Sequence, residues 1–351
     1  MNEPLTYGAA IGLAILLVVC LSFWAMRRGG RSRVHKGLVM DSGSILVVGS
    51  CNADLVVAAE QLPRPGETLL GHGFQTFSGG KGGNQAVAAA RAGGRVAMVA
   101  CVGTDAFGKR LVGDLASAGV DTSEISYVDE ASGVALIVTA ASGENAIVVA
   151  PGANGLLDAA AIDSVMKRVK RPTHILAQLE TPIEGVIRAA EQARAMGATF
   201  ILDPAPARSL PKELLELTDW ITPNEREAST LLGLENKTLE PFEAVRALRA
   251  LGPRNVILKM SSKGAVVLVG DAEPVHVRPV AVTAVDTTAA GDAFNGAFAV
   301  GLSEGLDPVS AAKFAAAAAA LSVTRRGAQP SMPSREEINA VLEGIRELQP
   351  S

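Results

Sequence analysis

One segment near the C-terminus combines the residue types that phosphoryl transfer needs: Asp286-Thr287-Thr288-Ala289-Ala290-Gly291-Asp292-Ala293-Phe294-Asn295-Gly296. Small residues at 289–291 let a ligand approach the backbone, and a helix that begins there directs its free N–H groups and positive dipole end at that ligand. Asp292, in the first turn, is placed to accept a hydroxyl proton while the N–H groups stabilise charge on the transferring group. We predict that the 289–292 backbone, with its small residues Ala289, Ala290 and Gly291, forms an anion hole and that Asp292 is a general base. Taken alone, Asp292 would also fit an acid that only stabilises the helix dipole.

A glycine-rich segment, Gly79-Gly80-Lys81-Gly82-Gly83-Asn84-Gln85, is the second candidate for a ligand site. It is not a Walker A loop, because no Ser or Thr follows Lys81 and no glycine stands five residues before Gly80. The phosphate chemistry is therefore assigned to the segment 286–296.

The pattern of apolar runs predicts the elements that position these residues. Short apolar strands alternate with helices, which is typical of an α/β fold with three layers, a mainly parallel sheet covered by helices on both faces. The expected strands are 45–50, 96–102, 174–178, 200–203, 220–222 and 256–260. The expected helices are 84–92, 106–118, 182–196, 224–232, 242–251, 291–304, 308–323 and 334–348. Ligands of such sheets bind beyond the carboxyl ends of the strands.

Two pairs of alternating segments, near 54–77 and 133–149, interrupt this pattern. Their alternation indicates exposed antiparallel strands. We expect them to fold as a small β lid on the main domain.

The first forty residues differ from the rest of the chain. No charge occurs between Pro4 and Met26, and residues 7–26 would span about 30 Å as a helix, the thickness of a bilayer core. A basic cluster at 27–36 follows, so the positive-inside rule places the remainder in the cytoplasm. The sequence predicts an N-terminal transmembrane helix and basic linker at 1–40 and a catalytic domain at 41–351, held at the inner face of the membrane. If the true start is Met40, the protein is simply cytoplasmic.

Composition and charge exclude several classes of protein. The chain has 351 residues, of which 48% are apolar, and this is too apolar for disorder. Its three cysteines are widely spaced, so no disulfide framework and no zinc site can be drawn from them. Residues 41–351 carry 27 basic against 35 acidic side chains, a net charge of −8. Such a body repels a phosphate backbone, so we expect no nucleic-acid partner.

In its motifs, the chain from about residue 43 to 348 resembles the ribokinase-like carbohydrate kinase family. The likeness rests on the order and separation of the segments 79–85 and 286–296. Further matching segments are Asn52-Ala53-Asp54, 204–208, 222–227 and 324–331. The resemblance implies ATP-dependent phosphorylation of D-ribose to D-ribose 5-phosphate, and a homodimer formed through the lid strands. A sister kinase acting on fructose, deoxyribose or adenosine, and a non-catalytic membrane-tethered sugar sensor, are the alternatives.

The resemblance also implies which residues bind the sugar and the cofactors ATP, Mg²⁺ and K⁺. The implied sugar site consists of Asn52, Asp54, Gly80, Lys81, Gly82, Gly83, Asn84 and Glu180, with Asp292 as base. The implied ATP site consists of Asn224, Met260, Ser261, Ser262, Lys263, Gly264, Ala265, Gly291 and Ala316. The implied potassium site consists of Asp286, Thr288, Ser322, Arg325, Gly327 and Ser331. Asn224 and Glu227 match an Asn-x-x-Glu motif in which Glu227 orders Mg²⁺ through water, and a helix N-cap followed by a first-turn acid is the alternative.

Ser261 departs from the family pattern, in which a glycine is usual at that position. If the position needs a positive φ or a close approach to a phosphate, serine would strain the backbone or weaken ATP binding. Gly264 is retained, so we expect modest damage rather than loss.

Overall fold

The computed structural model describes residues 43–169, 171–234 and 239–347. The predicted transmembrane helix at 7–26, the basic cluster at 27–36 and Met40 lie outside the described residues. Within the described part of the chain, no helix combines the length and the apolar character needed to cross a bilayer.

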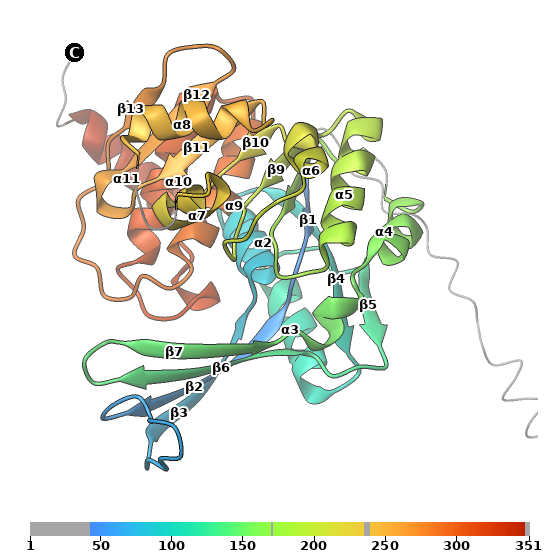
Figure 1. Ribbon diagram of the computed structural model, residues 1–351, viewed down its shortest axis with the longest axis vertical. Helices are drawn as coiled ribbons and strands as arrows, with labels where there is room; N and C mark the ends of the chain where they lie inside the picture. Colours follow the sequence, from blue (N-terminus) through green and yellow to red (C-terminus); the bar gives the residue numbers. More distant parts are fainter. Residues whose placement is uncertain (1–42, 170, 235–238, 348–351) are drawn as a thin grey trace, which may run out of the picture. The chain divides into compact units, whose positions relative to one another are not determined.

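The larger of two sheets has nine strands in the order β13-β12-β11-β10-β9-β8-β1-β4-β5 (Figure 1). The pairs from β5 to β11 are parallel, and only β12 and β13 run antiparallel to their neighbours. The strands are β1 (Ser44–Val48), β4 (Arg95–Gly103), β5 (Ile125–Val128), β8 (His174–Ala177), β9 (Thr199–Leu202), β10 (Trp220–Ile221), β11 (Asn255–Lys259), β12 (Ala265–Val269) and β13 (Val275–Val277). The expected mainly parallel α/β sheet is confirmed.

Helices cover both faces of this sheet. Successive strand residues point to opposite sides, and both sides carry apolar side chains that must be buried. Ile45 and Val47 of β1 belong to one apolar cluster, and Leu46 and Val48 belong to another. The first face is covered by α2 (Lys81–Arg91), α3 (Ala106–Ser117), α9 (Ala290–Ser303), α10 (Pro308–Ser322) and α11 (Arg335–Glu347). The second face is covered by α4 (Ala159–Met166), α5 (Ile183–Met196), α6 (Lys212–Leu217), α7 (Glu225–Leu231) and α8 (Pro241–Ala250).

Five of these elements are absent from the sequence prediction: α4, α6, β5, β12 and β13. The helices α4 and α6 have eight and six residues, which is too short for a helical period to stand out. The strand β12 begins directly after Gly264, inside the segment in which the resemblance implies an ATP site. All five lie toward the outer parts of the fold or follow a tight turn, and their absence does not change the predicted layers.

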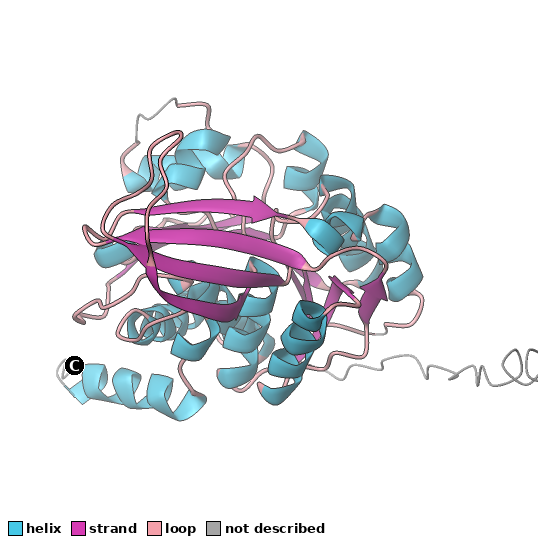
Figure 2. Cartoon of the chain, turned by 90° about the horizontal axis from the view of Figure 1, so that it is seen from below, coloured by secondary structure: helices cyan, strands magenta, loops and turns pink. Residues whose placement is uncertain are grey.

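A second, four-stranded sheet has the order β3-β2-β6-β7 (Figure 1). Its strands are β2 (Asn52–Ala59), β3 (His72–Gly79), β6 (Gly133–Ala140) and β7 (Asn145–Ala150), so both predicted strand pairs are present. We call it the lid sheet. In Figure 2 its long strands lie in front of the helices. Because β2 follows β1 after three residues, the lid sheet begins at the carboxyl edge of the larger sheet.

The parallel register aligns the ends of β1, β8 and β9, so the polar residues that follow β8 and β9 lie at the same carboxyl edge of the sheet. Val48 of β1 pairs with Ala177 of β8, and Ala177 pairs with Leu202 of β9. Gln178 and Asp203 therefore stand side by side just beyond the strands. Three 3₁₀ turns complete the described structure: η1 (Gly152–Leu156), η2 (Ser261–Lys263) and η3 (Gln329–Ser331).

Candidate active site

The predicted anion hole falls at the start of α9, where the N–H of Ala290 already donates to the Thr287 carbonyl at 3.3 Å. Ala289, at the N-cap, adopts a left-handed conformation with φ of 59°, and α9 begins at Ala290. Among the described residues, the backbone N–H groups of Gly291 and Asp292 have no hydrogen-bond acceptor. These two donors and the positive end of the helix dipole can therefore bind an anion.

Asp292 lies beside these donors and is only 4% exposed. Its Oδ2 accepts a hydrogen bond from Asn84 Nδ2 at 3.0 Å, and its Oδ1 accepts one from Gln85 Nε2 at 2.9 Å. Burial raises the pKa of Asp292, and the positive charge of Lys81 opposes that rise. A buried carboxylate with a raised pKa that is fixed by two amides is well suited to accept a proton.

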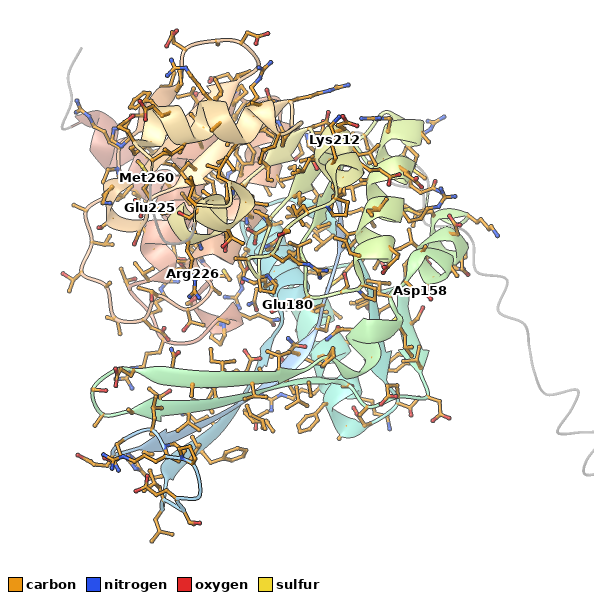
Figure 3. The ribbon with its side chains drawn as sticks, in the orientation of Figure 1. Asp158, Glu180, Lys212, Glu225, Arg226 and Met260 are labelled. Carbon is orange, nitrogen blue, oxygen red and sulfur yellow. The ribbon has the colours of Figure 1, made fainter. Side chains whose placement is uncertain are left out.

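The glycine-rich segment forms the start of α2, where it packs against the connection between β1 and β2. A side chain at Gly82 would put its Cβ 2.6 Å from the backbone N of Ser50. Glu180, in the loop after β8, accepts hydrogen bonds from the backbone N–H of Lys81 at 3.0 Å and from Ser50 Oγ at 2.6 Å. Figure 3 shows Glu180 near the junction of the two sheets.

Asn52 and Asp54 of β2 complete the implied sugar site. Asn52 Nδ2 lies 3.5 Å from Glu180 Oε2. The carboxylate of Asp54 lies over Gly79, where an added Cβ would come within 2.1 Å of Asp54 Oδ2. Burial and the negative charges of Glu180 and Asp292 raise the pKa of Asp54 to about 7. The structure thus brings the sugar-site residues together around Lys81, Glu180 and Asp292, with amide and carboxylate groups that can hydrogen-bond hydroxyls.

Lys81 supplies a positive charge close to Asp292 and Glu180. Burial disfavours its charged form, but the carboxylates of Asp292, Asp203 and Glu180 outweigh this effect and raise the pKa of the ammonium group. Among the described residues, no hydrogen bond or ion pair fixes its Nζ atom. An anionic or hydroxyl-bearing ligand can therefore use it.

Asn154 of η1 is a residue of this site that sequence reasoning missed. It accepts a hydrogen bond from the backbone N–H of Cys51 at 2.8 Å. Its Nδ2 donates to Asn52 Oδ1 at 2.7 Å and to the Cys51 carbonyl at 3.1 Å. Asn154 thereby determines which end of the Asn52 amide faces Glu180. No local pattern connects residues 102 positions apart.

Gln85, Gln178, Asp203 and Lys259 form a second group behind Asp292, and none of the four is among the predicted site residues, although Gln85 ends the glycine-rich segment. Gln85 Nε2 donates to Asp203 Oδ2 at 2.9 Å as well as to Asp292. Gln178 Nε2 donates to Gln85 Oε1 at 2.6 Å, and Lys259 Nζ donates to Asp203 Oδ1 at 3.0 Å. Gln178 and Asp203 directly follow β8 and β9, and Lys259 ends β11; this position at a strand end is the signal that could have found them.

Asn224 and Glu227 form a capping box at the start of α7. Asn224 Oδ1 accepts from the Glu227 N–H at 2.8 Å, and Glu227 Oε2 accepts from the Asn224 N–H at 2.7 Å. The helix-cap alternative is therefore correct for their geometry. Both Glu227 oxygens keep a lone pair for a water molecule, because each accepts one hydrogen bond from Asn224. This donor set fits an ion held through its water shell, as Mg²⁺ prefers.

The predicted ATP segment consists of a strained turn between β11 and β12. Ser261 has φ of 52° and Gly264 has φ of 90°, so the position of Ser261 does require a left-handed conformation. Ser261, Ser262 and Lys263 are exposed, and Lys263 pairs with Glu225. The side chains of Met260 and Ala265 are buried in apolar clusters, so these two residues can offer a ligand only their backbone. Ala316 lies half-buried on α10.

The residues of the implied potassium site lie on two segments that Asp286 joins, the loop after β13 and the stretch from the end of α10 to η3. Asp286 Oδ1 accepts from Thr288 N and Oγ1, and Oδ2 accepts from the Gly327 N–H at 2.9 Å. Although burial opposes the effect, these hydrogen bonds lower the pKa of Asp286. The buried Ser322 and Ser331 hydroxyls donate to backbone carbonyls, so their oxygens keep lone pairs for a cation. The side chain of Arg325 instead pairs with Glu337, which leaves only its carbonyl for this role.

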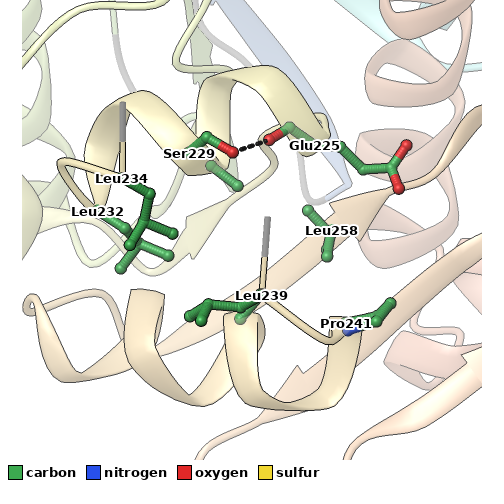
Figure 4. A pocket seen from close by; sticks show the side chains of 9 residues that line it. Glu225, Ser229, Leu232, Leu234, Leu239, Pro241 and Leu258 are labelled. Atoms are coloured by element: carbon green, nitrogen blue, oxygen red, sulfur yellow. Dashed lines mark hydrogen bonds between the residues drawn. The ribbon is translucent and has the colours of Figure 1, made fainter. Parts of the chain in front are cut away.

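A separate pocket lies between α7 and α8 (Figure 4). Its lining is mostly apolar, with Ser229 Oγ donating to the Glu225 carbonyl at one side. None of the predicted site residues lines it.

The chain is similar to known proteins in sequence and in structure. Residues 42–335 match the model of the pfkB family of carbohydrate kinases. A ribokinase of Haemophilus influenzae is 42% identical over 304 residues, which cover 86% of this chain and 98% of that protein. A deoxyribokinase of Salmonella typhi is 40% identical over 301 residues, which cover 85% of this chain and 98% of that protein. The structure of an Arabidopsis thaliana ribokinase complexed with ribose and ATP is 34% identical, covers 87% of this chain and 99% of its own, and has a TM-score of 0.78.

Proposed function

The chain belongs to the pfkB family of carbohydrate kinases, and we propose that it transfers the γ-phosphoryl group of ATP to D-ribose, which gives D-ribose 5-phosphate. One observation carries the proposal: the buried carboxylate of Asp292 is held by two amides directly beside the free N–H groups of α9. A base and an anion hole at one point are the elements that phosphoryl transfer to a hydroxyl requires.

In the proposed reaction, the sugar hydroxyl oxygen attacks the γ-phosphorus, its proton passes to Asp292, and the bond between the γ-phosphorus and ADP breaks. The N–H groups of Gly291 and Asp292 and the ammonium of Lys81 stabilise the charge that spreads over the transferring group. Asn52, Asp54, Asn84 and Glu180 orient the remaining hydroxyls. Mg²⁺ bound with ATP would neutralise phosphate charge, and Glu227 would hold one of its waters.

Asp292→Asn is the direct test of this proposal. We expect the variant to keep its fold and its affinity for ribose but to lose at least about a hundredfold in kcat, because asparagine cannot take the proton. Circular dichroism and ribose calorimetry control for folding and binding, and ADP formation measures turnover. Turnover close to that of the unmodified protein would exclude Asp292 as the base.

The principal alternative substrate is 2-deoxyribose, since a deoxyribokinase is among the similar proteins. The carboxylates of Asp54 and Glu180, with the Asn52 amide 3.5 Å from Glu180, support a sugar with adjacent hydroxyls. We therefore expect kcat/KM to be highest for ribose in a panel with deoxyribose, fructose and adenosine. A higher value for any of the others would identify a sister kinase, and no turnover with any would favour the sugar sensor.

We further infer that the protein sits at the inner face of a membrane through residues 7–26, with its catalytic domain in the cytoplasm. The support is the uncharged span followed by the basic cluster 27–36. Full-length protein should leave the membrane fraction only with detergent. Native protein that is soluble and starts at Met40 would instead be plainly cytoplasmic.

A further inference from the structure

We propose that Asp203 and Lys259 are positioning residues that hold the Gln85 amide against Asp292 and thereby tune Asp292 as a base. The inference rests on the proposed kinase reaction, in which Asp292 accepts the proton. Among the described residues, no hydrogen bond or ion pair joins either side chain to Asp292, so their effect passes through Gln85 and through the electric field.

The hydrogen bonds give Gln85 a single orientation. Its Oε1 accepts from Gln178 Nε2 at 2.6 Å, so the amide cannot be turned over without losing that bond. Its Nε2 then faces two carboxylates and donates to Asp203 Oδ2 and to Asp292 Oδ1, each at 2.9 Å. One NH₂ group has two hydrogens, and both are used. Any movement of Asp203 therefore changes the hydrogen bond that Asp292 receives.

Charge balance explains why Lys259 is part of the arrangement. Two buried carboxylates that share one amide repel each other, and Lys259 Nζ at 3.0 Å from Asp203 Oδ1 offsets the negative charge of Asp203. The ion pair is well enclosed, because the side chains of Lys259 and Asp203 are 12% and 2% exposed. Lys259 also lies at the anion hole, since an added Cβ at Gly291 would be 3.5 Å from its Nζ.

Other charged groups surround Asp292 and must stay constant in any test. On the sugar side these are Lys81, Asp54 and Glu180, and on the nucleotide side Glu227. The negative charge of Asp203 favours the protonated form of Asp292, whereas the hydrogen bonds from Gln85 and Asn84 favour the ionised form. Removing Asp203 should therefore make Asp292 a weaker base, and removing Lys259 should make it a stronger one.

The test is the pH dependence of kcat at saturating ATP and ribose, whose acidic limb reports the protonation of the base in the enzyme–substrate complex. We expect Asp203→Asn to move this limb to lower pH by about half a unit or more, and Lys259→Met to move it to higher pH. The double variant removes a neutral pair, so its limb should return to within a few tenths of a unit of the original. Glu124→Gln is the matched control, because Glu124 is 4% exposed and ion-paired with Arg168 in another part of the fold.

A purely structural ion pair would give a different result. Both single variants would then lower thermal stability and leave the acidic limb of the kcat profile unmoved, or both would move the limb in the same direction. Either outcome overturns the inference. If Lys259→Met does not fold, Gln85→Met replaces it. The Gln85→Met variant removes a hydrogen bond from ionised Asp292 without changing the charge, so the acidic limb of its kcat profile should move to higher pH. An acidic limb that does not move also contradicts the inference.

The same experiments separate this inference from the proposed function. If Asp292→Asn abolishes turnover but the limbs do not move, only the role of Asp203 and Lys259 is wrong. If the unmodified protein phosphorylates none of the sugars, the proposed function fails and this inference fails with it.

Discussion

At the scale of single residues, we expect Asp54 to make the binding of ribose depend on pH. Its pKa of about 7 means that it changes charge at neutral pH. The ionised carboxylate accepts hydrogen bonds from sugar hydroxyls, and protonation removes part of that capacity. The ionised fraction falls as pH falls through about 7, so we expect KM for ribose to rise several-fold between about pH 8 and about pH 6, with a smaller change in kcat.

Asp54→Asn separates this effect from other titrations. The variant should bind ribose at least about tenfold more weakly, and its KM should no longer change around neutral pH. Asp129→Asn, at an exposed position, serves as the control and should behave as the unmodified protein does. If KM of Asp54→Asn keeps its dependence on pH, another group is responsible.

Ser261 stores backbone strain in the segment next to the proposed ATP site. A left-handed conformation costs an L-residue about 1–2 kcal/mol, and glycine avoids this cost but loses more entropy on folding. Ser261→Gly should therefore raise the free energy of unfolding by up to about 1 kcal/mol, measured by urea denaturation. Ser262→Gly is the matched control on the same exposed turn. Ser262 has no positive φ, so this change should not raise the free energy of unfolding. Equal effects of the two changes would argue against strain at Ser261.

Single residues differ in how far the sequence alone could reveal them. Asp292 stands in a contiguous segment whose small residues and helix start point to its chemistry, and the structure places it beside free N–H groups. Asp203 carries no such context. Its importance comes from Lys259, 56 positions away, and from the Gln85 amide on α2, and only the packing of α2 against two strand ends brings these groups together.

At the scale of elements, the sequence predicted the repeating strands and helices and missed two short helices and three strands near one edge or the other of the sheet. The apolar run of β1, buried on both faces between β4 and β8, is unmistakable as a central strand. The helices α4 and α6 contain two turns or fewer, and their stability comes from packing rather than from a local pattern. The strand β12 was not predicted, because residues 260–265 were interpreted as one ATP-binding segment, and this segment includes the turn η2 and the first residue of β12.

The loop after β13 and the loop after α10 form one unit through Asp286, and we propose that potassium binds there. Replacing Na⁺ by K⁺ at constant ionic strength should raise kcat, because a cation there would stabilise the backbone that leads into the anion hole. Asp286→Asn should reduce this response, since it removes the negative charge while keeping an acceptor for the Gly327 N–H. Equal rates of the unmodified protein in the two salts would exclude a potassium site.

At the scale of the whole molecule, the lid sheet leaves apolar side chains in contact with solvent. Ile147 and Val148 of β7 are 54% and 66% exposed, and Leu136 of β6 is 53% exposed. Leu136 pairs with Val148, whereas Ile147 pairs with Ile137, so both faces of the sheet carry such residues. Contiguous exposed apolar residues on a sheet usually mark a protein interface, and β7 is also an unpaired edge.

We propose that a second copy of the chain covers these residues, and the mass in solution tests this. Sedimentation velocity should give twice the mass of one chain. Ile147→Lys combined with Val148→Lys places a charge on each face of the lid sheet, because neighbouring strand residues point to opposite sides, and this variant should sediment as a monomer. Val275→Lys, at a position that is 42% exposed on β13, is the control and should remain a dimer. Since Asp54 lies on the same sheet, we also expect the monomeric variant to bind ribose more weakly, and a lid variant that stays dimeric would place the interface elsewhere.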